Sequence, residues 1–172
     1  YYFKIFAYKA ASGPDYLTAG APTTSRTTLA TEPASDPATL TFSNVSANSV
    51  TINWVNPGGS GTDKLVTIYP TTGSTPSAPV DGTTYNANPA YGSGDLLGTG
   101  NRVVYKGTGT SVTITNLTAS TEYKVRVASF NGATGAENYK GTGVEVTQST
   151  NNEPSDHVTG FTSVFANTTS TA

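Results

Sequence analysis

Apolar and polar residues alternate through the middle of the chain, and a period of two is typical of β-strands. Val50, Ile52 and Trp54 alternate in this way, so we expect all three side chains to enter one core. The predicted strands are residues 40–42, 50–54, 64–69, 102–105, 112–117, 121–130 and 141–149. No segment shows helical periodicity. Seven short strands predict an all-β sandwich of two sheets.

Both ends of the chain repeat segments of its middle. The matched pairs are residues 1–9 with 123–131, 12–16 with 134–139, 32–36 with 153–156, and 42–48 with 161–167. The spacing is 122 residues from Tyr1 to Tyr123 and 119 residues from Phe42 to Phe161. Matches at nearly one spacing indicate a tandem repeat.

The repeat divides the chain into three parts. Residues 1–31 are expected to be the C-terminal strands of one repeat, residues 36–150 a complete repeat, and residues 154–172 the opening strands of the next. Each linker carries Glu-Pro with Asp, Ser or Asn, which predicts a short exposed junction. Ends that fall inside repeats lead us to expect a fragment of a longer protein.

The residues before the 121–130 strand form a recognisable motif. Leu117 lies six residues before Tyr123 and Thr121 lies two before it, ahead of alternating Val125 and Val127. In this pattern, and in the position of Trp54 on the second strand, the central repeat resembles fibronectin type III domains. The resemblance implies an immunoglobulin-like sandwich of seven strands, with a tyrosine hydroxyl bonded back to the main chain a few residues upstream. It also implies that these six residues carry stability.

A narrower resemblance is to tandem repeats of large bacterial secreted and cell-surface proteins. It rests on residues 79–85, 103–107, 130–132 and 137–139. It implies an extracellular or cell-surface location in a bacterium, with neighbouring repeats as partners within the chain.

Composition excludes several function classes. Charged residues make up 12% and the net charge is -2, so no basic field exists for nucleic acid. No apolar run approaches the ~20 residues that cross a bilayer. Cysteine is absent, which excludes disulfides and thiol chemistry.

The stretch from 71 to 101 is the main irregularity, since it is long and lacks a strand pattern. Tyr85 and Tyr91 are candidates to stack on sugar rings, with Asp81 and Asp95 accepting hydroxyl bonds. A binding role predicts that both rings lie exposed and coplanar. The alternative is a proline-pinned flap whose tyrosines cover the edge of the sandwich, and we favour it.

Catalytic and metal sites are not predicted. His157 is the only histidine, lies in a linker and has no hydrolase motif around it. Glu32 with Asp36, and Glu153 with Asp156, place too few oxygens at each junction for calcium. We therefore expect no catalytic, cofactor-binding or metal-binding residues.

The expected function is a non-catalytic structural, spacer or adhesion module of a bacterial extracellular protein. One alternative is a module that binds polysaccharide or a surface glycoprotein through residues 71–101. Another is an accessory stalk of an extracellular hydrolase whose catalytic domain lies elsewhere.

Overall fold

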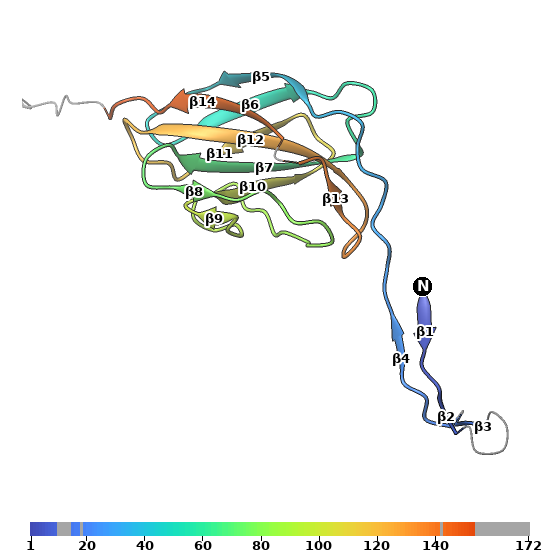
Figure 1. Cartoon of the computed structure of the whole chain (residues 1–172). Coiled ribbons are helices and arrows are strands. Elements are labelled where there is room, and N and C mark those ends of the chain that lie inside the picture. Colours follow the sequence, from blue (N-terminus) through green and yellow to red (C-terminus); the bar gives the residue numbers. More distant parts are fainter. Residues whose placement is uncertain (10–14, 18, 142, 154–172) are drawn as a thin grey trace, which may run out of the picture.

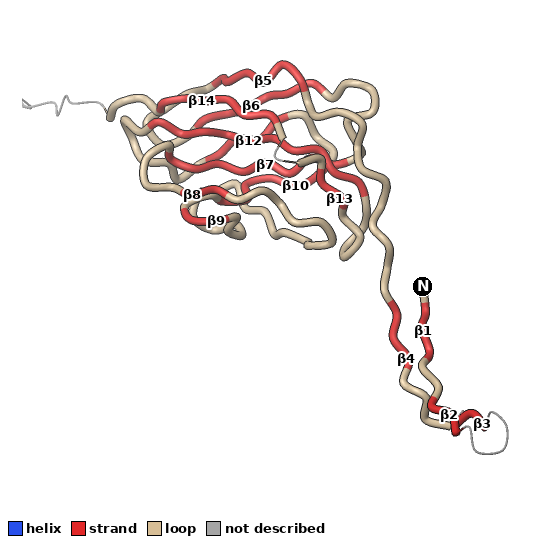
Figure 2. The backbone as a smooth tube through the Cα atoms, viewed as in Figure 1, coloured by secondary structure: helices blue, strands red, loops and turns tan. Residues whose placement is uncertain are grey.

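The computed structural model of the chain describes residues 1–9, 15–17, 19–141 and 143–153. Within these residues the regular structure is all strand (Figure 2). Two antiparallel sheets pack on one another between residues 36 and 150 (Figure 1), as the alternating pattern predicts. The segment 154–172, expected to open a further repeat, lies outside the described residues, as does His157.

The first sheet has three strands in the order β11-β6-β5. They are β5 (Ala38–Ser43), β6 (Val50–Val55) and β11 (Ser111–Ile114). Ile52 lies at the centre, opposite Phe42 on one side and Val112 on the other.

The second sheet has five strands, and β12 is central to it. The strands are β7 (Asp63–Pro70), β10 (Arg102–Gly107), β12 (Glu122–Asn131), β13 (Asn138–Tyr139) and β14 (Val144–Ser149). β12 pairs with β7 along one edge, and with β14 and then β13 along the other. Taken together, the two sheets contain the seven strands that the sequence predicts, and in addition β13, which was not predicted.

The main core lies between the two sheets. Trp54 is 3% exposed and packs edge-on against Tyr105, with ring centroids 5.5 Å apart. β12 contributes Tyr123, Val125 and Val127 to the same cluster. The alternation of β6 and β12 therefore buries the faces that the sequence indicates.

A second, smaller core covers the outer face of the β10-β7-β12 sheet. Its buried members are Leu65, Leu97, Val103, Phe130 and Tyr139. Strand β7 is buried on both faces between these cores, which explains its nearly continuous apolar run. The cover is supplied by residues 71–101, which hold the short strands β8 (Thr75–Pro76) and β9 (Gly98–Thr99).

The N-terminal strands form an arm that stands apart from the sandwich (Figure 1). We use "arm" for the described residues up to 29. In it β1 (Tyr2–Lys4) pairs with β4 (Thr23–Ser25), and β2 (Ala7–Lys9) pairs with β3 (Asp15–Leu17). Its apolar side chains Tyr1, Phe3 and Ile5 are 79%, 56% and 71% exposed.

Candidate functional site

The tyrosine corner lies where the chain enters β12. Tyr123 is 2% exposed, and its hydroxyl oxygen accepts the backbone N–H of Thr118 at 3.0 Å. The Thr121 hydroxyl donates to the carbonyl of Ala119 at 2.9 Å. Leu117 is buried in the main core beside these residues. The bond back to the main chain is therefore present at the residues that the sequence singles out.

Tyr85 and Tyr91 do not form the exposed, coplanar pair that a sugar-binding role predicts. Tyr85 packs edge-on against Tyr139 of the second core at 5.9 Å, whereas Tyr91 packs edge-on against Tyr123 of the main core at 5.6 Å. Both rings are half-buried. Each meets a different core, so they share no stacking surface.

The two phenol oxygens are also engaged inside the fold. The Tyr85 hydroxyl accepts the N–H of Val80 at 3.0 Å, and the Tyr91 hydroxyl donates to the carbonyl of Gly100 at 2.8 Å. Burial raises the pKa of Tyr91, with a smaller contribution from Tyr123. The tyrosines therefore hold residues 71–101, which we call the flap, against the sandwich.

Asp81 and Asp95 likewise bond to the chain itself. The Asp81 carboxylate accepts the N–H of Tyr139 at 2.8 Å. The Asp95 carboxylate accepts the N–H of Asn86 at 2.7 Å. Asp81 thus ties the flap to β13, and Asp95 closes a bond within the flap, so these acids fix its conformation.

The structure adds a buried carboxylate that sequence reasoning missed. Glu137 is 0% exposed, and its Oε1 accepts the Thr84 hydroxyl and the Lys106 ammonium, the latter at 3.2 Å. Its Oε2 accepts the N–H of Gly135 at 2.8 Å. Glu137 thus joins the flap, β10 and the turn before β13.

The electrostatics of Glu137 suit a structural role. Burial raises the pKa of this carboxyl, but hydrogen bonds from Thr84, its own backbone N–H, Lys106 and Gly135 outweigh burial, and the pKa lies below its usual range. Both oxygens accept hydrogen bonds from donors of the fold itself, which suits a structural role. Glu137 lies in a polar turn of the sequence, and nothing in the local pattern there indicates that its side chain is buried.

Lys64 is a second buried charge that the sequence does not reveal. Its side chain is 0% exposed, and Nζ donates to the carbonyls of Ser60 and Gly61 at 2.8 and 3.0 Å. Burial lowers the pKa of this lysine, and the negative charges of Asp63 and Asp36 oppose that effect. Lys64 therefore organises the loop after β6.

That loop forms one wall of a cradle for residues 30–36, which we call the linker. The other wall is the turn region 131–140. The N–H of Ala30 donates to the carbonyl of Ala136 at 2.9 Å, and Asn138 Nδ2 donates to the carbonyl of Ala30 at 2.9 Å. Asn131 Nδ2 donates to the carbonyl of Thr31 at 2.8 Å. The linker is bound through its own main chain.

Further along, the linker is packed as well as bonded. Pro33 is buried. A Cβ added to Gly61, whose φ is +72°, would stand 2.7 Å from Pro33 Cγ. Ser35 N–H donates to the carbonyl of Gly59 at 3.0 Å. The junction is therefore exposed at Thr31, Glu32 and Ala34, as expected, whereas Pro33 is buried because the 57–62 loop packs against it.

The junction acids also bond within the fold. Asp36 Oδ1 accepts the N–H of Ser129 at 3.2 Å, and burial raises the pKa of Asp36 despite this bond. Glu32 Oε1 lies 3.8 Å from Lys140 Nζ. Among the described residues, no three His, Cys, Asp or Glu side chains group to hold a metal ion. The same residues include no helix able to span a bilayer.

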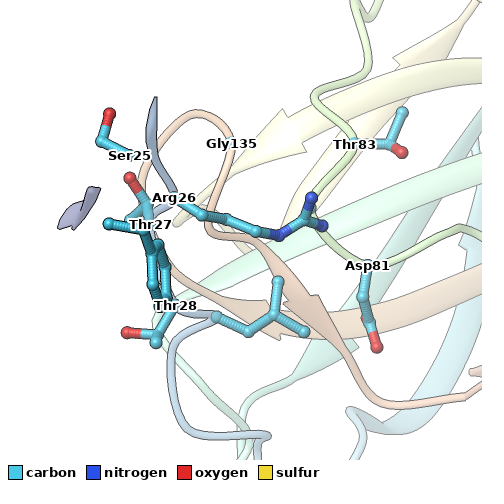
Figure 3. A pocket seen from close by; sticks show the side chains of 10 residues that line it. Ser25, Arg26, Thr27, Thr28, Asp81, Thr83 and Gly135 are labelled. Carbon is cyan, nitrogen blue, oxygen red and sulfur yellow. The ribbon is translucent and has the colours of Figure 1, made fainter. Parts of the chain in front are cut away.

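A groove of about 780 Å³ lies between the arm and the flap. Residues 25–29 and Phe3 line one side, while residues 81–83 and Gly135 line the other. Figure 3 shows Arg26 extended across this groove toward the side that carries Asp81 and Thr83. The groove separates the arm from the sandwich just before the linker enters its cradle.

Comparison with known proteins identifies the family to which this sandwich is similar. The family model described as fibronectin type III domain matches residues 35–144. No curated protein matches the chain.

Three solved structures illustrate the similarity. A fibronectin type III domain of human fibronectin type III domain containing protein 3 is 19% identical, with a TM-score of 0.46, covering 74% of this chain and 96% of that one. A two-domain segment of chicken tenascin is 19% identical, with a TM-score of 0.44, covering 87% and 63%. Domains A168–A170 of titin are 21% identical, with a TM-score of 0.43, covering 67% and 32%.

Proposed function

The chain belongs to the fibronectin type III family, and from that premise we propose that it is a non-catalytic spacer unit of a tandem array at a bacterial cell surface. Members of this family commonly serve as structural modules. Each unit of the array has its own core, and the linker fixes its position relative to the unit before it.

The observation that carries the proposal is the strand register of the arm. β1 pairs Tyr2 with Ser25, Phe3 with Thr24 and Lys4 with Thr23. Adding 122 to each number gives the pairs Lys124 with Thr147, Val125 with Val146 and Arg126 with Glu145, which are those between β12 and β14. One hairpin is therefore present twice in the chain with the same register.

The second half of the arm follows the same rule. β2 pairs Tyr8 with Tyr16, and β12 pairs Phe130 with Tyr139. The offsets are 122 and 123, and β4 returns to an offset of 122, so the slip of one residue is confined to the stretch between β2 and β4. This agreement supports the assignment of residues 1–31 as the last strands of a preceding repeat, and of residues 36–150 as a complete one.

The external location and the bacterial source are proposed on the narrower resemblance of the repeat, and a chain without cysteine is compatible with bacterial surface proteins that fold without disulfides. A spacer of this kind extends either an adhesin or an accessory stalk that holds a catalytic domain away from the envelope. Its partners are the neighbouring repeats. A module that binds polysaccharide or glycoprotein depended on a shared surface of Tyr85 and Tyr91, and we do not propose it.

The test is the dimension of a longer array. Residues 1–150 are joined to a second copy of residues 30–150, so that the second unit receives its natural linker. Ten residues of β12 at about 3.4 Å each make a unit about 35 Å long. Small-angle X-ray scattering should show a maximum dimension larger by about that length. An unchanged maximum dimension would mean that the units lie side by side, and would contradict a spacer.

A further inference from the structure

We propose that Asn131 and Gly132 form a deamidation site, which the docked linker keeps closed and whose reaction prevents the linker from docking again. The two residues are the only Asn-Gly pair in the chain. Glycine after asparagine favours deamidation, because it has no side chain to hinder attack by its backbone nitrogen on the asparagine amide. The inference goes beyond the spacer function and does not depend on it.

The fold requires glycine at position 132. Its φ is +109°, a backbone conformation that side chains of other residues disfavour. A Cβ added here would stand 2.2 Å from the carbonyl oxygen of Ala136 and 3.0 Å from Cβ of Ala30. Because Ala30 belongs to the linker, the linker itself packs on Gly132.

The fold also uses the amide of Asn131 in full. Its Oδ1 accepts the N–H of Thr62 at 2.8 Å, and its Nδ2 donates to the carbonyl of Thr31 at 2.8 Å. One side chain thus joins the loop after β6 to the linker. An amide supplies the acceptor and the donor together, whereas a carboxylate supplies acceptors only. The structure therefore places a reactive pair at the point where the linker is held.

Deamidation of this pair needs only water. The backbone nitrogen of Gly132 forms a bond to Cγ of Asn131 and loses its proton, while the Cγ–Nδ2 bond breaks and ammonia leaves. The product is a cyclic imide. Water then adds to one of its two carbonyl carbons and opens the ring, which leaves aspartate or isoaspartate at position 131.

The docked linker opposes ring closure at both reacting residues. The bond to Thr31 holds Nδ2, which is the leaving group. Ala30 packs against Gly132, whose nitrogen must move toward Cγ. The pairing of Asn131 with Asn138 at the end of β12 is a third restraint, and it does not involve the linker. Release of the linker therefore removes two of these three restraints.

The products bind the linker less well than Asn131 does. A carboxylate at this position still accepts the N–H of Thr62, but its other oxygen faces the Thr31 carbonyl oxygen that Nδ2 contacts at 2.8 Å. Two acceptors with no proton between them repel each other. Isoaspartate also adds one carbon atom to the main chain and so disturbs the pairing with Asn138. The reaction thus releases the linker in one direction only.

The first experiment compares deamidation rates in the full chain at mildly alkaline pH. Pro33→Asp puts a charge in a buried site of the linker, whereas Ala34→Asp puts the same charge at the next, exposed position and is the matched control. Peptide mapping by mass spectrometry measures aspartate and isoaspartate at position 131. We expect Pro33→Asp to react at least about tenfold faster than the control and the unmodified chain.

The second experiment tests the consequence without waiting for the reaction. Hydrogen exchange is measured at the amides of Ala30 and Ser35, which donate to the main chain of the sandwich. In Asn131→Asp they should exchange about tenfold faster, because one hydrogen bond is lost and a repulsive contact replaces it. Asn151→Asp is the control, since it loses a similar bond to the Val45 carbonyl away from the linker, and it should leave both amides unchanged.

Three results would overturn the inference. The first is that position 131 stays asparagine in all of these proteins, and the second is equal deamidation in Pro33→Asp and Ala34→Asp. The third is unchanged exchange of the linker amides in Asn131→Asp. Circular dichroism checks that the sandwich of Pro33→Asp is folded. If it is not, Ser35→Pro replaces it, because proline lacks the N–H that Ser35 donates to Gly59.

Discussion

Substituting Glu137→Gln tests whether the buried carboxylate anchors the flap. The substitution keeps the shape of the side chain, removes its charge and replaces one oxygen with an NH₂ donor. Glu137 accepts from Thr84, Lys106 and Gly135, so either orientation of the amide sets a donor against a donor. An unmatched buried donor costs about 1–3 kcal/mol, and Lys106 also loses its counter-charge. We expect the free energy of unfolding to fall by about 3 kcal/mol.

The matched control is Glu32→Gln. Glu32 also pairs with a basic group, Lys140 at 3.8 Å, but the two side chains are 54% and 32% exposed. A water-accessible pair contributes about 1 kcal/mol or less. Urea denaturation monitored by circular dichroism measures both changes in the free energy of unfolding. The comparison requires that the slope of this free energy against urea concentration is the same in each protein. Equal losses for the two substitutions would refute the reasoning from burial.

Acidity gives an independent check on the same residue. The pKa of Glu137 is lower in the folded protein than its ordinary value, so the ionised carboxylate favours folding. Its contribution is complete above the unfolded pKa of about 4.3 and is lost as the pH falls through the lower folded value. The stability gap between the unmodified chain and Glu137→Gln should therefore narrow below about pH 4. An equal difference in stability between the two proteins at pH 7 and at pH 3 would contradict this role of the ionised carboxylate.

The remaining predictions concern the corner and the cradle. Tyr123→Phe removes one buried hydrogen bond and should lower stability by about 1 kcal/mol, and an unchanged melting midpoint would count against the corner. Asn138→Ala removes a donor to Ala30 and should speed amide exchange in the linker while leaving the melting midpoint of the sandwich nearly unchanged. Gly61→Ala adds clashes with Pro33 of the linker and with the Phe130 carbonyl to backbone strain, whereas Gly73→Ala, with a similar φ and open space, adds strain alone. Gly61→Ala should cost more by calorimetry, and equal losses would show that the linker does not pack there.

The sandwich was predictable because its main core has a simple periodicity. Val50, Ile52 and Trp54 alternate on β6, and Tyr123 follows a motif that fixes its environment locally. The repeat was also readable in the sequence, because two copies of one hairpin carry matching residues at one spacing.

The second core was harder to predict from the sequence. Its residues lie on strands that bury both faces, so β7 reads as one apolar run without showing what covers it. The cover is the flap, whose tyrosines contact two separate cores through long-range packing that no local pattern encodes. Glu137 in a turn and Lys64 at the start of β7 were missed for a related reason, since charged residues are ordinarily solvated and only tertiary partners reveal their burial.

Trp54 is the only tryptophan of the chain, and its indole is sealed in the main core against Tyr105. Its fluorescence emission therefore reports on that core alone. The emission maximum lies at shorter wavelength while the two sheets stay packed together, and it moves to longer wavelength once water reaches the indole. Opening of the flap or release of the linker leaves the indole where it is. An emission spectrum that stays constant while other probes change thus distinguishes local opening from unfolding of the whole unit. The measurement needs no added dye.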